Sequence, residues 1–439
     1  GDGAKGQARA PERERIGATV VVDAGGWALK YGVAGDDAPS VVTPSAVGVD
    51  GGKGEPKGLA AGRSALAAYG EAVQVKEVVQ DGRVAHWAGF EALLRYAEEA
   101  VFGEDADRVE RRFMLVESLD AASEDRERMA EIYFEKFGAT SLFACKSAPL
   151  NLYACARSSG LVLDIGGDRS SSCVVVDGFV HRDSIKFSQV AGKKVAETLL
   201  DRLETGAADK PGINVRPRYT FVRKTERDGS PKIAIQEAPA HASFARFWKL
   251  DLVDQMIHAR ARAAPVDPQA LARVSRPTQS NTDELVSSAT IPEEDEDTYE
   301  LPDGTLVPRA ARAARDALEI LFNPKSLGRP ETNVPVQEIV VKSAQFMTNA
   351  DSRRDMYSNI VLAGGVTATP GFADRVACEI AVRARGAKPR IIVSGQEARK
   401  HNAWIGGSIF SSLTALENLW VSKSEYAEQG AKVINHKCP

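Results

Sequence analysis

The chain has 439 residues, enough for one large two-lobed body or for several domains. It is 43% hydrophobic and 26% charged with a net charge of -4, as in soluble globular proteins, and lacks the basic surplus of a dedicated nucleic-acid-binding protein. No apolar run reaches the roughly 18–20 residues of a membrane helix, and neither the five cysteines nor the six histidines have the spacing of a metal site.

The first part of the chain alternates polar and apolar segments. Residues 1–16 are polar and charged, which predicts a mobile tail. Residues 20–34 are typical of a strand, an Asp-x-Gly-Gly turn and a second strand. Residues 50–64 are rich in glycine and lysine, which predicts a loop or a small exposed subdomain.

Helices and strands alternate over most of the remaining chain, which indicates an α/β fold. Residues 158–180 repeat the strand, Asp-x-Gly-Gly turn and strand, and residues 357–376 combine a buried strand, Gly364-Gly365 and a helix start. Residues 275–298 are polar and acidic, which predicts a surface insertion. Apolar spacing predicts helices over residues 90–101, 123–137, 144–156, 193–204 and 247–262.

Two segments share one plan, "VVVDAGGWALKYGVAG" (20–35) and "LVLDIGGDRSSSCVVVDG" (161–178). Each has an apolar strand, an aspartate, one residue, two glycines and another strand. Glycine lets the backbone approach an oxyanion closely, and successive turn amides can form an anion-binding nest. An ordinary tight turn is the alternative for either hairpin alone. The repetition about one domain apart indicates two lobes that clamp one nucleotide.

The aspartates that end these strands, Asp23 and Asp164, cannot contact phosphate directly because like charges repel. A hydrated Mg²⁺ between them would explain both, since this ion prefers oxygen ligands and water. Lys30 could return along the second strand to neutralise phosphate charge. Gly364-Gly365 ahead of a helix predicts a floor for the base and phosphates, with a routine strand-to-helix turn as the alternative.

The first hairpin resembles the corresponding segment of actins and actin-related proteins. So do "YELPDG" (299–304), "LFNPKSLG" (321–328), "NIVLAGGVTATPGFADR" (359–375) and the long block from "WIGGSIF" to "HKCP" (404–439). The similarity runs from about residue 18 to the last residue, interrupted by loops. It implies the α/β, actin/hexokinase-type bilobal ATPase fold, with two duplicated lobes in four subdomains around a nucleotide cleft.

The resemblance also implies a division of the chain and a set of ligand contacts. Subdomain 1 would comprise residues 17–48, 86–160 and 401–439; subdomain 2, residues 49–85; subdomain 3, residues 161–191 and 330–400; and subdomain 4, residues 192–329 with the insertion. The cofactors would be ATP and Mg²⁺ or Ca²⁺, with Asp23 and Asp164 holding the ion through water. The expected ATP contacts are Asp23, Gly25, Gly26, Lys30, Asp164, Gly166, Gly167, Gly192, Gly364, Gly365 and Lys400.

Hydrolysis needs a water molecule that is oriented in line with the γ-phosphate and relieved of a proton. Actins use a glutamine and a histidine for this, and the matching positions here are Ser147 and Ser171. A serine hydroxyl is short and a poor base. We therefore expect ATP binding with very slow or no hydrolysis, and no catalytic residue, unless other side chains substitute.

The two turns also depart from the actin pattern. Trp27 stands where actins have a small residue, and it could act as a lid or fill space between the lobes. The second turn reads "GGD" where actins read "GDG", and Arg169 follows it. This change puts the ribose contacts in doubt.

Finer features resemble the actin-related protein 4 class, which is nuclear. They are "FACKSAPLNLYACARSSGLVLDIGG" (143–167), "RDGSP" (227–231) and the terminal "HKCP". This implies a nuclear scaffold that pairs with actin in remodelling or histone acetyltransferase complexes. A cytoplasmic or cytoskeletal actin-related protein, in a motor complex or an axoneme, and an active ATPase are the alternatives.

Surface features bear on polymerisation and partners. Residues 49–70 do not resemble the hydrophobic loop through which actins polymerise, so we expect no filaments. The resemblance places an apolar groove between subdomains 1 and 3, where the helicase-SANT-associated helix of a remodeller ATPase could dock; core packing is the alternative. The acidic run 292–297 fits either histone contact or a solvated loop. The groove residues are Tyr153, Phe179, Phe410, Leu413 and Leu419.

Overall fold

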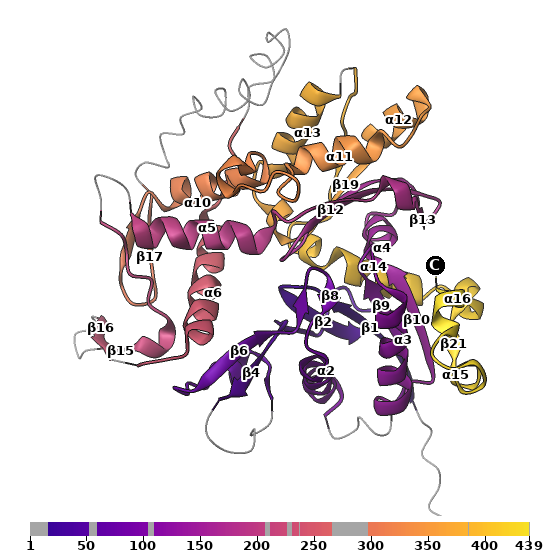
Figure 1. The fold of residues 1–439 in the computed structure, drawn as a ribbon, viewed down its shortest axis with the longest axis horizontal. Helices are drawn as coiled ribbons and strands as arrows, with labels where there is room; N and C mark the ends of the chain where they lie inside the picture. The colour runs from indigo at the N-terminus through magenta and orange to yellow at the C-terminus, as the bar shows by residue number, and fades with distance from the viewer. Residues whose placement is uncertain are drawn as a thin grey trace, which may run out of the picture.

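Two lobes, each centred on a six-stranded sheet, make up the part of the chain that the computed structural model describes (Figure 1). The described residues are 16–51, 59–103, 109–206, 211–225, 231–236, 238–265, 297–384 and 386–438. None of the helices in these ranges is long and apolar enough to span a membrane.

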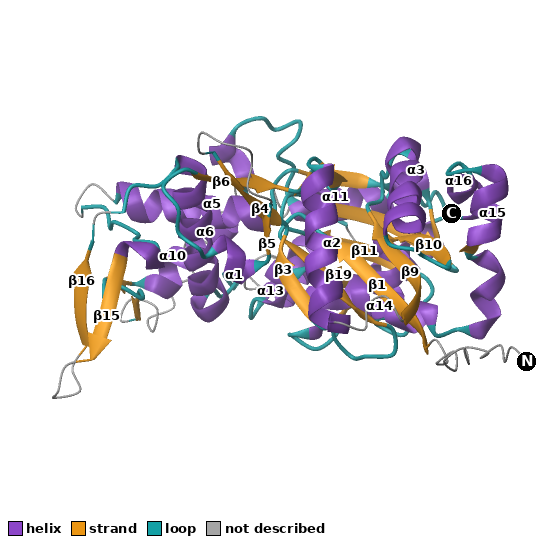
Figure 2. Ribbon diagram, turned by 90° about the horizontal axis from the view of Figure 1, so that it is seen from below, coloured by secondary structure: helices purple, strands orange, loops and turns teal. Residues whose placement is uncertain are grey.

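The first lobe has the strand order β21-β10-β9-β1-β2-β3. Its central strand β1 runs parallel to β9 and antiparallel to β2, and Val20, Val21 and Val22 at its centre are buried because helices cover both faces. Helix α2 crosses one face (Figure 2) and α14 the other. The strands are β1 (Ile16–Ala24), β2 (Ala28–Val33), β3 (Val41–Pro44), β9 (Val109–Glu117), β10 (Ser141–Lys146) and β21 (Val421–Ser422). The helices are α2 (Trp87–Phe102), α3 (Ser123–Glu131), α4 (Ser147–Tyr153), α14 (Asn402–Ser411), α15 (Lys423–Gln429) and α16 (Val433–Lys437).

The second lobe repeats this plan. Strand β11 runs parallel to β19 and antiparallel to β12, as β1 does to β9 and β2. The order is β13-β12-β11-β19-β20, with β14 also paired to β12. The strands are β11 (Gly160–Ile165), β12 (Ser170–Val176), β13 (Phe179–Val180), β14 (Lys186–Ser188), β19 (Ile360–Ala363) and β20 (Ile391–Ile392). The helices are α5 (Gly192–Thr205), α6 (Ala242–Arg260), α10 (Ala310–Leu318), α11 (Val336–Ala344), α12 (Ala350–Tyr357) and α13 (Phe372–Arg383).

Smaller sheets extend the far ends of both lobes. The hairpin β15-β16 projects from the second lobe at the end opposite α15 and α16 (Figure 2). The elements are α1 (Arg63–Leu66), β4 (Ala46–Asp50), β5 (Ala60–Ala61), β6 (Val73–Glu77), β7 (Val79–Gln80), β8 (Arg83–Val84), β15 (Phe221–Thr225), β16 (Pro231–Ile235), β17 (Thr298–Glu300) and β18 (Leu306–Pro308).

The predicted α/β two-lobed fold is confirmed, but the starts of three helices were wrong, and the helix expected from residue 90 begins at Trp87. The helix expected from residue 144 begins at Ser147, because β10 continues to Lys146 and buries Ala144 and Cys145 beside β9. The helix expected from residue 247 begins at Ala242, where the ring of His241 accepts a hydrogen bond from the amide of Ser243.

Some predictions lie wholly or partly outside the described residues. They concern the tail up to residue 15, residues 52–58 of the exposed loop, and the insertion from 275 to 296 with its acidic run. Ile16, assigned to the tail, already belongs to β1, and Thr298, assigned to the insertion, begins β17.

Candidate nucleotide cleft

The two Asp-x-Gly-Gly turns have the same local geometry. The amide of Gly25 donates to the carbonyl of Ala28, and the amide of Gly166 donates to the carbonyl of Arg169, each at 3.1 Å. Both turns therefore close in the same way at the ends of β1 and β11.

The next two amides of each turn have no hydrogen-bond partner within the described ranges. They belong to Gly26 and Trp27 in the first turn and to Gly167 and Asp168 in the second. Paired unbonded amides are the donors that an anion nest supplies. The sequence repeat thus corresponds to two sites suited to phosphate oxygens.

The second glycine of each turn contacts the other turn. A Cβ on Gly26 would overlap the carboxylate of Asp168, and a Cβ on Gly167 would lie 2.8 Å from the amide nitrogen of Trp27. Both positions therefore need glycine for close approach. These contacts between the first turn and the second turn join the two lobes.

The strand-end carboxylates differ in their partners. Asp23 is 8% exposed and lies 2.5 Å from Nζ of Lys30, its cross-strand neighbour. Asp164 accepts a 3.3 Å hydrogen bond from Nδ2 of Asn151, and burial raises its pKa. A divalent cation suits this pair, because it would offset the buried charge of Asp164 as well as that of phosphate.

All eleven residues expected to contact ATP line one cavity of about 410 Å³. Gly364 is the tightest point of its floor: it has φ +92°, and a Cβ there would overlap the carbonyl oxygen of Ile165. Gly365 has ordinary contacts at 3.7 Å or more, so its side of the floor is open. The structure brings these residues together from five separate segments of the chain.

The cavity has further polar lining residues that the sequence analysis did not identify. Asp254 and His258 enter from α6, with the His258 Nε2 3.6 Å from Oδ2 of Asp254. Burial, followed by the neighbouring Asp251, raises the pKa of Asp254 to about 7. Their i,i+4 spacing was the available signal, but it lay in the divergent middle of the chain. Asn151, Arg399, His401 and Asn402 also line the cavity.

Both serines at the expected hydrolytic positions face this region. Ser147, the first residue of α4, lines the main cavity and an adjoining one of about 130 Å³, and Ser171 lines the latter opposite Asp164. Neither hydroxyl is a strong base. The arrangement can hold an anion, and these two positions offer little help in deprotonating water.

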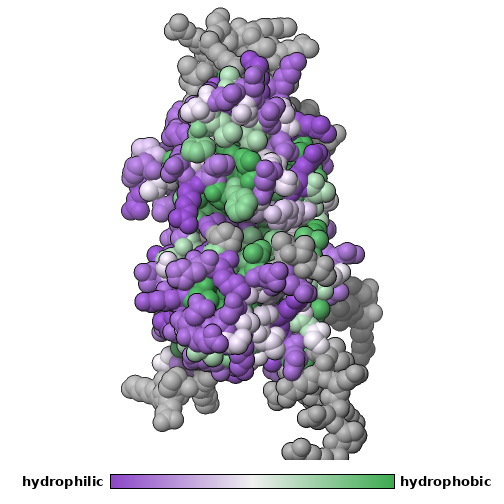
Figure 3. All heavy atoms as spheres, turned by 90° about the vertical axis from the view of Figure 1, so that its right-hand side faces the viewer, coloured by the Kyte–Doolittle hydropathy of each residue, from purple (hydrophilic) through white to green (hydrophobic). Residues whose placement is uncertain are grey.

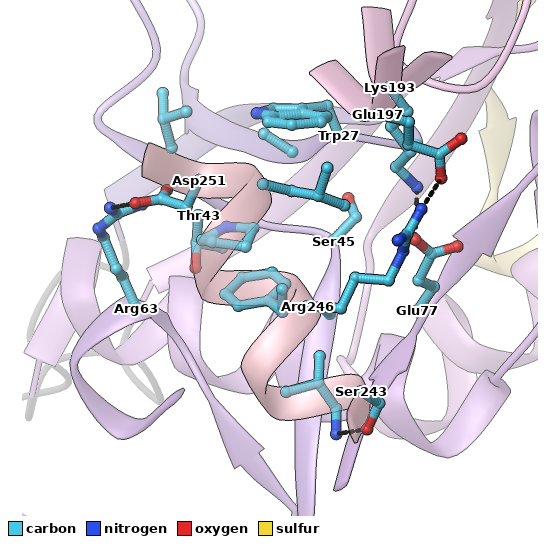
Figure 4. Close-up of a pocket in the computed structure, with 18 residues that line it drawn as sticks. Trp27, Thr43, Ser45, Arg63, Glu77, Lys193, Glu197, Ser243, Arg246 and Asp251 are labelled. Carbon is cyan, nitrogen blue, oxygen red and sulfur yellow. Dashed lines mark hydrogen bonds and ion pairs between the residues drawn. The ribbon is translucent and has the colours of Figure 1, made fainter. Parts of the chain in front are cut away.

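Trp27 lines both this cavity and a second one of about 380 Å³, which we call the cleft mouth (Figure 4). Although it belongs to the first turn, its side chain packs against the apolar core of the second lobe. Arg169 instead pairs with Asp120 of the first lobe, its Nη1 2.8 Å from Oδ2, and lies over the ring of Phe187. Both residues therefore link the lobes.

Ion pairs surround the cleft mouth (Figure 4). Arg63 lies 2.6 Å from Asp251, across the mouth. Lys193 lies 2.6 Å from Asp168 and 2.9 Å from Glu77. Together they hold β6 and α1 close to α5 and α6.

The five expected groove residues fall into two groups. The rings of Tyr153 and Phe410 stack with their centroids 6.0 Å apart, and Phe410 is only 7% exposed. This pair therefore lies largely beneath the surface. Phe179 is 68% exposed, and Leu413 and Leu419 are also exposed. The side of the molecule that carries β13 and α16 shows several apolar patches among mostly hydrophilic side chains (Figure 3).

Comparisons with known proteins cover nearly the whole chain. The profile of the family described as Actin matches residues 15–439. Actin-related protein 4 of Arabidopsis thaliana is 28% identical over 460 aligned positions, which cover 96% of this chain and 98% of that protein. Actin-related protein 4 of Oryza sativa subsp. indica is 28% identical over 459 positions with the same coverage.

Proposed function

Because the chain belongs to the actin family, we propose that it is an actin-related scaffold subunit of a nuclear complex that remodels chromatin or acetylates histones. Its partners would be actin and the helicase-SANT-associated helix of a remodeller ATPase. The observation that carries this proposal is the stacked pair Tyr153–Phe410 together with the exposed Phe179, whose strand β13 contacts α4. An amphipathic helix can cover such a surface with its apolar face.

The cleft would contribute as a structural nucleotide site. The unbonded turn amides and Lys30 suit the phosphates of ATP, and Asp23 and Asp164 suit a hydrated Mg²⁺ or Ca²⁺. When bound, the ion offsets phosphate charge. The chain's own residues orient the nucleotide between the lobes. Neither Ser147 nor Ser171 supplies a base at the expected hydrolytic positions, so we propose very slow hydrolysis.

The proposal is tested by assembly from purified components. Full-length protein, actin and a recombinant helicase-SANT-associated segment are mixed and separated by size-exclusion chromatography. We expect a ternary complex that Phe179→Asp disrupts, because a buried unpaired charge opposes apolar docking.

The matched control is Val222→Asp on the projecting hairpin β15, since Val222 is also an exposed apolar residue. It should leave the complex intact. Absence of any complex with the wild-type chain would contradict the proposed scaffold role, as would exclusive recovery of a tagged copy from cytoplasm.

A further inference from the structure

The end of the cleft between the two turns carries an unusual carboxylate. Asp168 follows the two glycines of the second turn, and its side chain fills the space that Gly26 leaves beside the first turn. Its Oδ2 is buried and has no hydrogen-bond partner within the described ranges. An anionic group of the protein therefore already lies against the first nest.

The ammonium group of Lys193 does not give this end of the cleft a net positive charge. Lys193 contacts Asp168 at 2.6 Å and Glu77 at 2.9 Å, so one ammonium serves two carboxylates. These three groups sum to one negative charge. Burial disfavours charge on Lys193, but Asp168 and Glu77 outweigh this and raise its pKa, which keeps the ammonium committed to them.

We propose that Asp168, held by Lys193, makes this cleft select a nucleoside diphosphate over a triphosphate. The inference rests on the proposed nucleotide site and specifies its ligand. A third phosphate between the turns would meet a carboxylate at short range in a partly buried site, where like charges repel strongly. A diphosphate can use the amide of Gly167, Lys30 and the floor, and it leaves the space beside Gly26, where the Asp168 carboxylate lies, without added charge.

Isothermal titration of the full chain with ADP and with ATP, each with Mg²⁺, tests this selection. We expect ADP to bind at least about tenfold more tightly than ATP, as one unfavourable charge contact of this kind would give. Asp168→Gly, and the isosteric Asp168→Asn in case the glycine variant folds poorly, should shift the ATP-to-ADP affinity ratio towards ATP by about tenfold.

The matched control is Asp201→Asn, which removes the same charge from an exposed position on the helix that carries Lys193. It should leave the ratio unchanged. If neither Asp168→Gly nor Asp168→Asn changes the ATP-to-ADP affinity ratio, the proposed role of Asp168 is overturned and the nucleotide site itself is not. Failure of every variant to bind either nucleotide would instead overturn the nucleotide site itself.

Discussion

The two Asp-x-Gly-Gly turns have the same backbone hydrogen bond, and they differ in the side chain that lies opposite each aspartate. In the first, Lys30 lies opposite Asp23 and forms an ion pair with it. In the second, Ser171 lies opposite Asp164, which has an amide partner in place of a cation. The duplicated fold thus presents one carboxylate that is neutralised within its own hairpin and one that is not.

The difference shows how a symmetric scaffold can hold an asymmetric ligand. Backbone amides come from both lobes in the same arrangement, but only the first hairpin carries a cation directly opposite its strand-end aspartate. A bound divalent ion would supply the missing positive charge beside Asp164. Substitutions in or beside only one of the two turns therefore test this interpretation.

The largest expected effect on stability comes from Gly364, which supports the second turn. Gly364 lies against the carbonyl of Ile165 with φ +92°. Gly364→Ala adds a backbone collision to a strained dihedral, so we expect a loss of about 3 kcal/mol or more in unfolding free energy. Urea denaturation of the nucleotide-free protein measures it.

The adjacent Gly365→Ala is the control for this substitution. Its Cβ would make ordinary contacts at 3.7 Å and 3.8 Å, and its φ is not in the left-handed region. We expect a change of about 1 kcal/mol or less. Equal losses for the two alanine variants would contradict the view that close approach at Gly364 supports the second turn.

Much of this architecture could be predicted from sequence because the turns are local. An apolar strand, an aspartate and two glycines specify a hairpin within a dozen residues, and the repetition revealed two lobes. The helix at Ser147 was placed three residues early because its apolar periodicity is continuous with buried β10. Periodicity alone does not separate a buried strand from a helix.

The missed part of the site depends on packing between distant segments. Asp254 and His258 line the cavity only because α6 packs across α5 at the mouth. Likewise, the contact of Asp168 with Gly26 arises between turns about 140 residues apart in sequence. Local propensity carries no information about such contacts.

Removing one carboxylate at a time sharpens the comparison of the turns. Asp23→Asn leaves the partly buried Lys30 without its ion-pair partner, so we expect a loss of about 1–3 kcal/mol. Asp164→Asn should be neutral or stabilising at pH 7. Burial raises the folded pKa of Asp164, so the folded state bears the cost of its ionisation. Urea denaturation at pH 7 should rank the variants in this order, and the reverse order would contradict it.

Asp254 gives a further effect within the second lobe, and this effect depends on pH. Its folded pKa of about 7 exceeds the ordinary value, so its contribution is fully present below about pH 4 and is lost as pH rises towards 7. Relative to Asp254→Asn, wild-type stability should fall by up to about 1.4 kcal/mol per pH unit across this window. Thermal unfolding from pH 4 to 8 measures the slope, and the exposed Asp201→Asn should retain the wild-type profile.

The smallest expected effect on stability lies at the cleft mouth, where it is informative about exchange. Arg63 and Arg246 are each 51% exposed, but Arg63 pairs across the mouth with Asp251, whereas Arg246 pairs with Glu197 within the second lobe. Exposed ion pairs contribute about 1 kcal/mol or less, so neither Arg63→Gln nor Arg246→Gln should change unfolding greatly. Of the two substitutions, only Arg63→Gln removes a contact that must break for the mouth to open. A fluorescent nucleotide should therefore dissociate several-fold faster from Arg63→Gln than from Arg246→Gln. Equal dissociation rates would show that Trp27 and the two turns, and not the ion pair at the mouth, limit nucleotide exchange.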